Sequence, residues 1–245
     1  MPNTATSVSQ SDNHGLSPVI LAVATTPERR VIERSNIDAY GAALLQTGIG
    51  PEQVRSISGD IRMCRPAGLI SIGTAGGLTR KLLPGRLLLP KHVVTENGQV
   101  FPVTSPWHTR VCQRLGEHDI ETGTIVSVAR PVRRPHDKQR LQSSTGAVAV
   151  DMESAELAHI ALQHSIPFLV VRAVADPLDQ PLPRSAIAAL TSRGNLYIAG
   201  LLGQLLHHPG EITALIRLNA NFQAACRTLD ACCRAAGEQM SFPDT

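Results

Sequence analysis

Aromatic residues are scarce in this chain of 245 residues, because Phe, Trp and Tyr together make up only 3% of it. Hydrophobic residues nevertheless reach 42%, so a core must be filled with Ala, Val, Ile and Leu. Aliphatic cores of this kind suit layered α/β domains, in which buried strands are covered by Ala-rich helices. The composition therefore favours an α/β fold.

Cysteine pairs with metal-binding or redox spacing are also absent. The chain has five cysteines, an odd number, and none of them forms a CxxC pair. The adjacent Cys232 and Cys233 do not make a zinc site alone, and no His or Cys cluster has ligand spacing. We expect a reduced, cytoplasmic protein that needs no metal and no cofactor.

Long apolar runs and a strong charge imbalance are missing as well. No run of about 18 apolar residues occurs, so no membrane span is expected. A secretory signal requires an apolar segment, and none precedes Pro18, so no such signal is expected. The net charge of +3 is too small to indicate nucleic acid as a partner. Residues 1–17, rich in Ser, Asn, Thr and Gln, are expected to form a flexible tail before a single domain over 18–245.

Apolar runs typical of strands alternate with segments of helical spacing, which indicates one layered α/β domain. Strands are expected at 19–24, 41–47, 68–72, 87–95, 124–128, 147–150 and 168–175. Helices are expected at 51–62, 107–117, 155–164, 185–206 and 212–229. The last has an amphipathic pattern that favours a core-facing helix, with a partner-helix or membrane-surface role as the alternative.

Acidic residues follow two of the expected strands. Asp176 ends the run 168–175, while Asp151 and Glu153 follow the run 147–150. Ligands gather at strand ends in such sheets, and burial favours the neutral form of an acid, which can then donate a proton. The alternatives are structural: Asp176 as a turn former before Pro177, and the other two as first-turn helix acids.

A Gly-rich segment, Gly73-Thr74-Ala75-Gly76-Gly77, follows the expected strand 68–72. We expect a turn that cradles a phosphate or lets a sugar approach the backbone. It lacks the Lys-Ser/Thr ending of a P-loop and the GxGxxG order of a dinucleotide fold. Tight-turn geometry and close strand–helix packing remain the alternatives.

Four segments in order resemble the nucleoside phosphorylase and nucleosidase superfamily, over roughly residues 18–206. They are Thr47-Gly48-Ile49-Gly50, Gly73-Thr74-Ala75-Gly76-Gly77-Leu78, Ala149-Val150-Asp151-Met152-Glu153-Ser154-Ala155 and Val170-Val171-Arg172-Ala173-Val174-Ala175-Asp176. The resemblance implies a three-layer α/β/α fold around a mixed, partly barrel-like sheet, and a homo-oligomer. Residues 170–177 and 182–183 are also similar to hopanoid-biosynthesis-associated phosphorylases. That narrower resemblance implies adenosylhopane as a lipid-linked nucleoside substrate, with a peripheral membrane contact.

The resemblance also implies roles for individual residues. Asp176 would bind or protonate the purine at N7, and Glu153 would hold the ribose hydroxyls, with Met152 beside the sugar. Further substrate-binding positions would be Asp151, Thr74, Gly76 and Gly77.

The group that attacks the sugar is left open. Thr74 falls near the nucleophile, and Arg29 or Arg30 matches a phosphate-binding Arg of bacterial purine phosphorylases, with inorganic phosphate as the co-substrate. Glu28 instead matches the acid that activates water in nucleosidases. These alternatives predict phosphorolysis and hydrolysis respectively.

The chain departs from the family pattern at several positions. Asp151 replaces a Glu common in nucleosidases, and Ala175 replaces a frequent Ser. Ser71 stands where hexameric phosphorylases carry a phosphate-binding Arg, and residues 129–131 lack the usual base-stacking aromatic. The leading hypothesis is cleavage of the N-glycosidic bond of an adenine nucleoside. The alternatives are a methylthioadenosine/S-adenosylhomocysteine or futalosine nucleosidase, and a non-catalytic nucleoside-binding protein.

Overall fold

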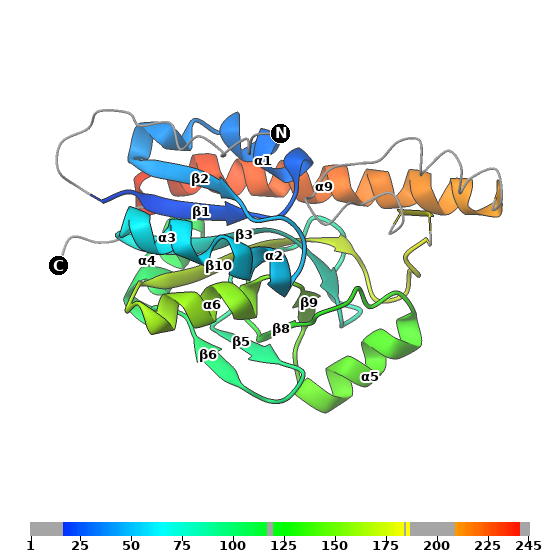
Figure 1. The fold of residues 1–245 in the computed structure, drawn as a ribbon. Helices are drawn as coiled ribbons and strands as arrows, with labels where there is room; N and C mark the ends of the chain where they lie inside the picture. Colours follow the sequence, from blue (N-terminus) through cyan, green and yellow to red (C-terminus); the bar gives the residue numbers. More distant parts are fainter. Residues whose placement is uncertain (1–16, 117–119, 184, 187–208, 241–245) are drawn as a thin grey trace, which may run out of the picture.

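The computed structural model describes residues 17–116, 120–183, 185–186 and 209–240. Its described residues form a mixed sheet of ten strands (Figure 1). The strands are β1 (Val19–Val23), β2 (Ala42–Gln46), β3 (Gly68–Gly77), β4 (Leu87–Leu88), β5 (His92–Thr95), β6 (Val100–Pro102), β7 (Ile120–Glu121), β8 (Ile125–Ser127), β9 (Ala149–Asp151) and β10 (Phe168–Asp176). The predicted α/β fold with a mixed central sheet is confirmed.

Helices cover the sheet on both faces. They are α1 (Thr26–Glu33), α2 (Pro51–Ser56), α3 (Ser58–Cys64), α4 (Ser105–Leu115), α5 (Pro135–Thr145), α6 (Ser154–Gln163) and α9 (Ile212–Ala236), with short 3-10 turns at Ile37–Tyr40, Pro209–Glu211 and Gly237–Met240. Figure 1 shows α2, α3 and α6 in front of the sheet and α9 behind it, where α9 packs against β10 and α1. This arrangement gives the three layers expected from the resemblance.

Strand β3 is the centre of the sheet. Its first half pairs in parallel with β1, and β10 runs parallel along most of its length. Its last two residues, Gly76 and Gly77, pair antiparallel with Val150 and Ala149 of β9. Nearly every residue of β1 and β10 is buried, as expected for parallel strands covered on both faces. The order β6-β5-β8-β9-β3-β10-β4-β7 then carries the sheet to both edges.

The turn predicted over the Gly-rich segment is wrong, because β3 continues through Gly77. The glycines let the neighbouring strands approach β3 closely and do not reverse the direction of the chain. A side chain at Gly76 would lie 3.1 Å from Cγ1 of Val150 and 3.3 Å from Oδ2 of Asp176. The segment pairs with β10 on one side and, at Gly76 and Gly77, with β9, whereas the backbone N–H of Thr74 donates to the side chain of Glu28.

Two other predicted elements are each divided into two in the structure. The helix expected over 51–62 is divided into α2 and α3 at Ile57, whose ψ of 4° is not helical. The strand expected over 87–95 is split into β4 and β5 by a segment that contains Pro90, which has no N–H to donate to a ladder.

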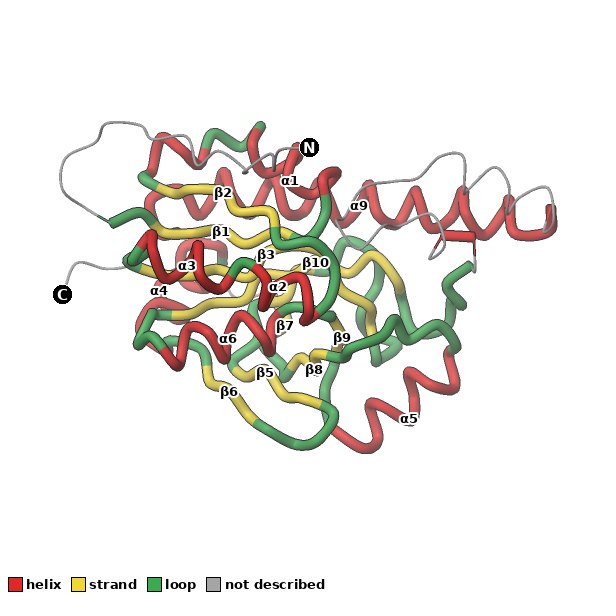
Figure 2. Tube along the Cα trace, in the orientation of Figure 1, coloured by secondary structure: helices red, strands yellow, loops and turns green. Residues whose placement is uncertain are grey.

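Helix α9 confirms the helix expected near the C-terminus, but only its second half faces the core. Its second half buries Leu229, Cys233 and Ala236, whereas none of residues 212–224 is buried. Figure 2 shows this first half extending beyond the sheet. The helix expected over 185–206 and the tail at 1–17 lie outside the described residues, apart from residues 17 and 185–186. No helix in the described ranges is both long and apolar enough to cross a membrane.

Two helices that contribute to the site, α1 and α5, were not predicted. Thr25 caps α1, since its hydroxyl accepts a hydrogen bond from the backbone N–H of Glu28, and Glu28 reaches back to the N–H of Thr25. This reciprocal capping box fixes the start of the helix. Helix α5 begins at Pro135, whose missing N–H costs nothing at a first helical position.

Candidate active site

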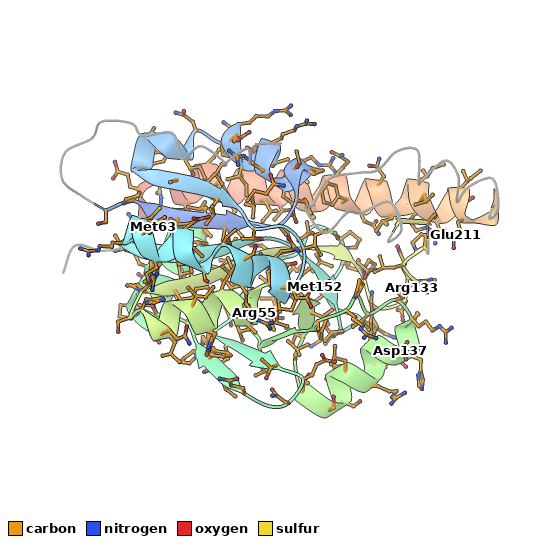
Figure 3. All side chains as sticks on the ribbon, in the orientation of Figure 1. Arg55, Met63, Arg133, Asp137, Met152 and Glu211 are labelled. Carbon is orange, nitrogen blue, oxygen red and sulfur yellow. The ribbon has the colours of Figure 1, made fainter. Side chains whose placement is uncertain are left out.

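Acidic side chains gather where β3 and β10 end and where β9 leads into α6. The parallel pairing of β3 with β10 brings Asp176 level with Gly76, and β9 brings Val150 to the same glycine. Glu28 lies on the first turn of α1, directly after β1. Residues from four distant parts of the chain therefore meet at one end of the sheet. Figure 3 labels Met152, which precedes Glu153 and lies beside the start of α2.

Glu28 is held by four hydrogen bonds from two threonines. Its Oε2 accepts hydrogen bonds from the backbone N–H of Thr25 at 3.0 Å and from the Thr25 hydroxyl at 2.7 Å. Its Oε1 accepts from the N–H of Thr74 at 2.7 Å and from the Thr74 hydroxyl at 2.8 Å. Only 2% of the residue is exposed. The structure thus joins Glu28 and Thr74, both of which were predicted to lie near the nucleophile.

Glu153 occupies the N-cap position of α6, but its side chain does not cap the helix. Its Oε1 instead accepts a 2.9 Å hydrogen bond from the backbone N–H of Gly50. Burial is the main cause that raises the pKa of Glu153 to about 7, and the negative charge of Asp151 adds to it. The positive charge of Arg172 opposes this shift. Glu153 can therefore change its charge near neutral pH.

The carboxylate of Asp151 forms an ion pair with the guanidinium of Arg172. Nε and Nη2 of Arg172 donate to its Oδ2 at 2.9 and 2.7 Å, and the Ser154 hydroxyl donates to the same oxygen. Nη2 of Arg172 also reaches the hydroxyls of Ser71 at 2.7 Å and Ser154 at 3.0 Å. The Asp151 side chain is only 1% exposed. The resemblance implied substrate binding for this residue, but its carboxylate lies beneath the site and holds Arg172.

Gly73 separates two charged groups of the site. A side chain at this position would lie 3.0 Å from Oε1 of Glu28 and 3.2 Å from Nη1 of Arg172. Glycine is therefore needed here so that both groups can reach the strand. Arg172 was not proposed as a site residue from the sequence, although an arginine inside the buried run 168–176 was a signal, since buried charges are paired in proteins.

Asp176 ends β10 and is 13% exposed at its side chain. Its Oδ2 forms a 2.7 Å ion pair with Nζ of Lys138, which comes from α5. Burial raises the pKa of Asp176 to about 6, and Lys138 opposes that rise through its charge and its hydrogen bond. Lys138 was not identified from the sequence, where it stands in a polar segment without apolar periodicity.

The remaining predicted residues divide into two groups. Met152 belongs to the site, because its Cε lies 3.6 Å from the position of a side chain on Gly50, next to the anchor of Glu153. Gly77 has a packing role, since a side chain there would lie 3.2 Å from Cβ of Leu82. Arg29 forms a 2.7 Å ion pair with Glu33, one helical turn along α1.

Comparison with known proteins places this geometry in a family. The sequence matches the phosphorylase superfamily over residues 20–206. The structure is similar to futalosine hydrolase of Helicobacter pylori, with 15% identity and a TM-score of 0.68 over 91% of this chain and 98% of that one. It is also similar to the methylthioadenosine/S-adenosylhomocysteine nucleosidase of Neisseria meningitidis in complex with methylthio-immucillin-A, with 17% identity and a TM-score of 0.68 over 91% and 99%.

A third similar structure is the nucleosidase of the same kind from Colwellia psychrerythraea in complex with adenine, with 15% identity and a TM-score of 0.69 over 92% of this chain and 96% of that one. At these identities the similarity concerns the fold. The family match covers most of the 245 residues and includes all the acidic residues of the site. The chain therefore belongs to the phosphorylase superfamily and is an enzyme of that superfamily.

Proposed function

We propose that the protein hydrolyses the N-glycosidic bond of an adenine nucleoside, with Asp176 as the acid, Glu153 as the ribose ligand and Glu28 as the base that activates water. One observation carries the proposal. The Glu28 carboxylate is buried and held by four hydrogen bonds between Thr25 and Thr74. A carboxylate fixed at the edge of a nucleoside site is suited to removing a proton from water, which here takes the place of one of the two threonine hydroxyls.

Hydrolysis transfers the ribose from N9 of the purine to water. The water oxygen forms a bond to C1′ of the ribose while the C1′–N9 bond breaks, and the electron pair of that bond goes to the purine. Asp176 donates its proton to N7 of the purine, and Glu28 accepts the proton of the water. Glu153 binds the sugar hydroxyls, where its negative charge favours the positive charge that develops on the ribose ring.

Water is favoured over phosphate by the charges of the site. A phosphate ion requires free cationic donors, but Arg29 is engaged by Glu33 and Arg172 by Asp151. The carboxylates of Glu28 and Glu153 would also repel an anion at this place. These contacts support hydrolysis rather than phosphorolysis.

The choice of adenine is supported by the relatives named above. The Colwellia nucleosidase is seen with adenine, and the Neisseria enzyme with methylthio-immucillin-A. An acid such as Asp176, whose pKa lies near 6, can be protonated before the base departs. We transfer the adenine specificity of these enzymes to this chain as part of the proposal.

For the 5′ group we propose an apolar substituent, of which adenosylhopane is the specific case implied by residues 170–177. The side-chain amide of Asn221 in α9 donates a 2.9 Å hydrogen bond to Gln180, in the loop that follows Asp176. The nearby half of α9 carries Ile212 and Ile216, which are 47% and 66% exposed. The two exposed isoleucines on the helix that contacts this loop support a lipid-linked nucleoside as part of the proposal.

A product assay tests the proposal. The purified protein is incubated with methylthioadenosine, futalosine and adenosylhopane, each with and without phosphate, and the free base and the sugar are quantified. We expect free base and unphosphorylated sugar without added phosphate, and the fastest turnover with adenosylhopane. A sugar 1-phosphate would refute hydrolysis. Nucleoside binding without base release would indicate a non-catalytic binding protein, and full turnover by Asp176→Asn would refute the role of Asp176.

A further inference from the structure

Lys138 is a buried cation with a complete set of partners. Its side chain is 0% exposed, and its Nζ donates to Oδ2 of Asp176 at 2.7 Å, to the backbone carbonyl of Asp176 at 3.2 Å and to that of Pro177 at 2.9 Å. An ammonium group has three N–H donors. The three acceptors therefore use all of them, and they lie on two consecutive residues at the end of β10.

Helix α5 contributes little else to the core. Of its residues, all of which the structure describes, Lys138 alone is buried, and Leu141 is only partly buried against a small apolar cluster. Burying a lysine costs free energy, and this desolvation lowers its pKa. A helix that buries a cation and almost no apolar surface is better suited to setting the state of Asp176 than to stabilising the fold.

The ion pair distinguishes the two oxygens of the Asp176 carboxyl group. Oδ2 faces Lys138 and also lies 3.3 Å from the position of a side chain on Gly76, so it points to the sheet. Oδ1 is then the oxygen that can face a ligand. Among the described residues, the charges that act on this pair are the two partners themselves and Asp179, and Asp179 lies 3.7 Å from Arg80.

We propose that Lys138 is a positioning residue for the reaction: it holds Oδ2 of Asp176, directs Oδ1 to the purine, and stabilises the carboxylate that remains after the proton has left. This inference rests on the proposed function. In the step, the Oδ1–H bond breaks and the N7–H bond forms, while Lys138 keeps its protons throughout. Its positive charge makes Asp176 a stronger acid at the moment of base departure.

The positive charge of Lys138 affects the pH dependence of the reaction. Asp176 must be protonated at the start of the step, so activity falls as the pH rises through its pKa, which gives the alkaline limb of the pH profile. Removing the positive charge of Lys138 removes the contribution that lowers this pKa. The alkaline limb of the profile therefore moves to higher pH, while the rate constant of the protonated form falls because the acid has become weaker.

The experiment measures kcat/KM for methylthioadenosine between pH 5 and 9. In Lys138→Met, which removes the ammonium group and keeps an unbranched side chain, we expect the alkaline limb to move up by about one pH unit. We also expect the rate constant of the protonated form to fall at least about tenfold. Arg140→Met is the matched control, because it removes an exposed positive charge from the same helix. The alkaline limb and the maximum of its kcat/KM profile are expected to match those of the wild type.

Two further variants keep the test decisive. Lys138→Arg retains the charge, and its limb is expected to stay near that of the wild type even if Lys138→Met does not fold. In an Asp176→Asn background, Lys138→Met is expected to cause no further loss of rate, because Lys138 acts through Asp176.

The outcomes separate the two proposals. An unmoved alkaline limb in Lys138→Met, or a limb displaced in Lys138→Arg as far as in Lys138→Met, overturns the positioning role while the proposed function stands. Absence of base release by the wild-type enzyme, or full turnover by Asp176→Asn, overturns the proposed function itself.

Discussion

The backbone N–H of Gly50 donates a 2.9 Å hydrogen bond to Oε1 of Glu153, although 103 positions separate the two residues in the sequence. Gly50 has a φ of +88°, a conformation that residues with a side chain adopt only at a cost. The acid assigned to the ribose is therefore anchored by a stretch of backbone that favours glycine.

Replacing Gly50 tests this anchor. We expect Gly50→Ala to lose about 1–3 kcal/mol of stability through backbone strain, and to raise KM because the N–H moves away from Glu153. Gly41→Ala is the matched control, since Gly41 also has a positive φ, +75°, but no atom within 4 Å of an added side chain. Both variants should have a lower melting temperature than the wild type in thermal melts. Equal KM values in the two folded variants would contradict the role of the anchor.

Glu28→Gln is expected to lower kcat by about 10²–10⁴-fold, the range lost when a general base is removed, with little change in KM. The glutamine carbonyl can still accept from Thr74, although the capping interaction with Thr25 weakens. The comparison variant is Glu33→Gln, which breaks the exposed ion pair with Arg29 on the same helix. Steady-state kinetics should show near wild-type turnover for that variant. Similar losses in both would argue for a general defect of α1.

The pH dependence of stability should reveal Glu153. Its pKa is about 7 in the folded protein, above its ordinary value of about 4.3. Between these values the folded state holds a proton that the unfolded state has lost, so this group lowers the free energy of unfolding as the pH rises. Glu153→Gln should therefore be more stable than the wild type at pH 8, by up to about 3 kcal/mol. At pH 4 we expect the two proteins to have the same free energy of unfolding. Chemical denaturation at both pH values measures the difference.

The catalytic pH profile should be a narrow bell. Below a pH of about 7 Glu153 takes up a proton and loses its negative charge, and above about 6 Asp176 loses the proton it must donate. The active form, with Glu153 ionised and Asp176 protonated, is then a minority species, and kcat/KM should peak between pH 6 and 7. A broad plateau extending past pH 8 would show that these two groups do not set the limbs.

Local sequence patterns were sufficient for much of the fold and for part of the site. The apolar run before Asp176 and the run before Asp151 marked buried strands, and acidic residues directly after such strands lie at a sheet end. The position of Asp176 and Glu153 in the structure follows from these patterns. The choice between turn and strand at Gly73–Gly77 did not, because it depends on the pairing of Gly76 with the distant Val150.

The partners of the acids were beyond the reach of local patterns. Lys138 meets Asp176 only after α5 has packed beside the end of β10, and the two residues are 38 positions apart. Arg172 looked like part of an apolar strand, and its pairing with Asp151 is set by the fold. Charge pairing between separate elements leaves no periodic signal in a sequence, in contrast to the burial of a strand.

Gly76 is hydrogen-bonded into the sheet between Asp176 of β10 on one side and Val150 of β9 on the other. The acid proposed for the base and the segment that leads to the acid proposed for the ribose are thus both paired with a single residue. Backbone pairing therefore sets the distance between the proposed base-binding and ribose-binding segments. Divergence of specificity within such a scaffold must therefore be sought outside the sheet, in the segments that contact the 5′ end of the nucleoside.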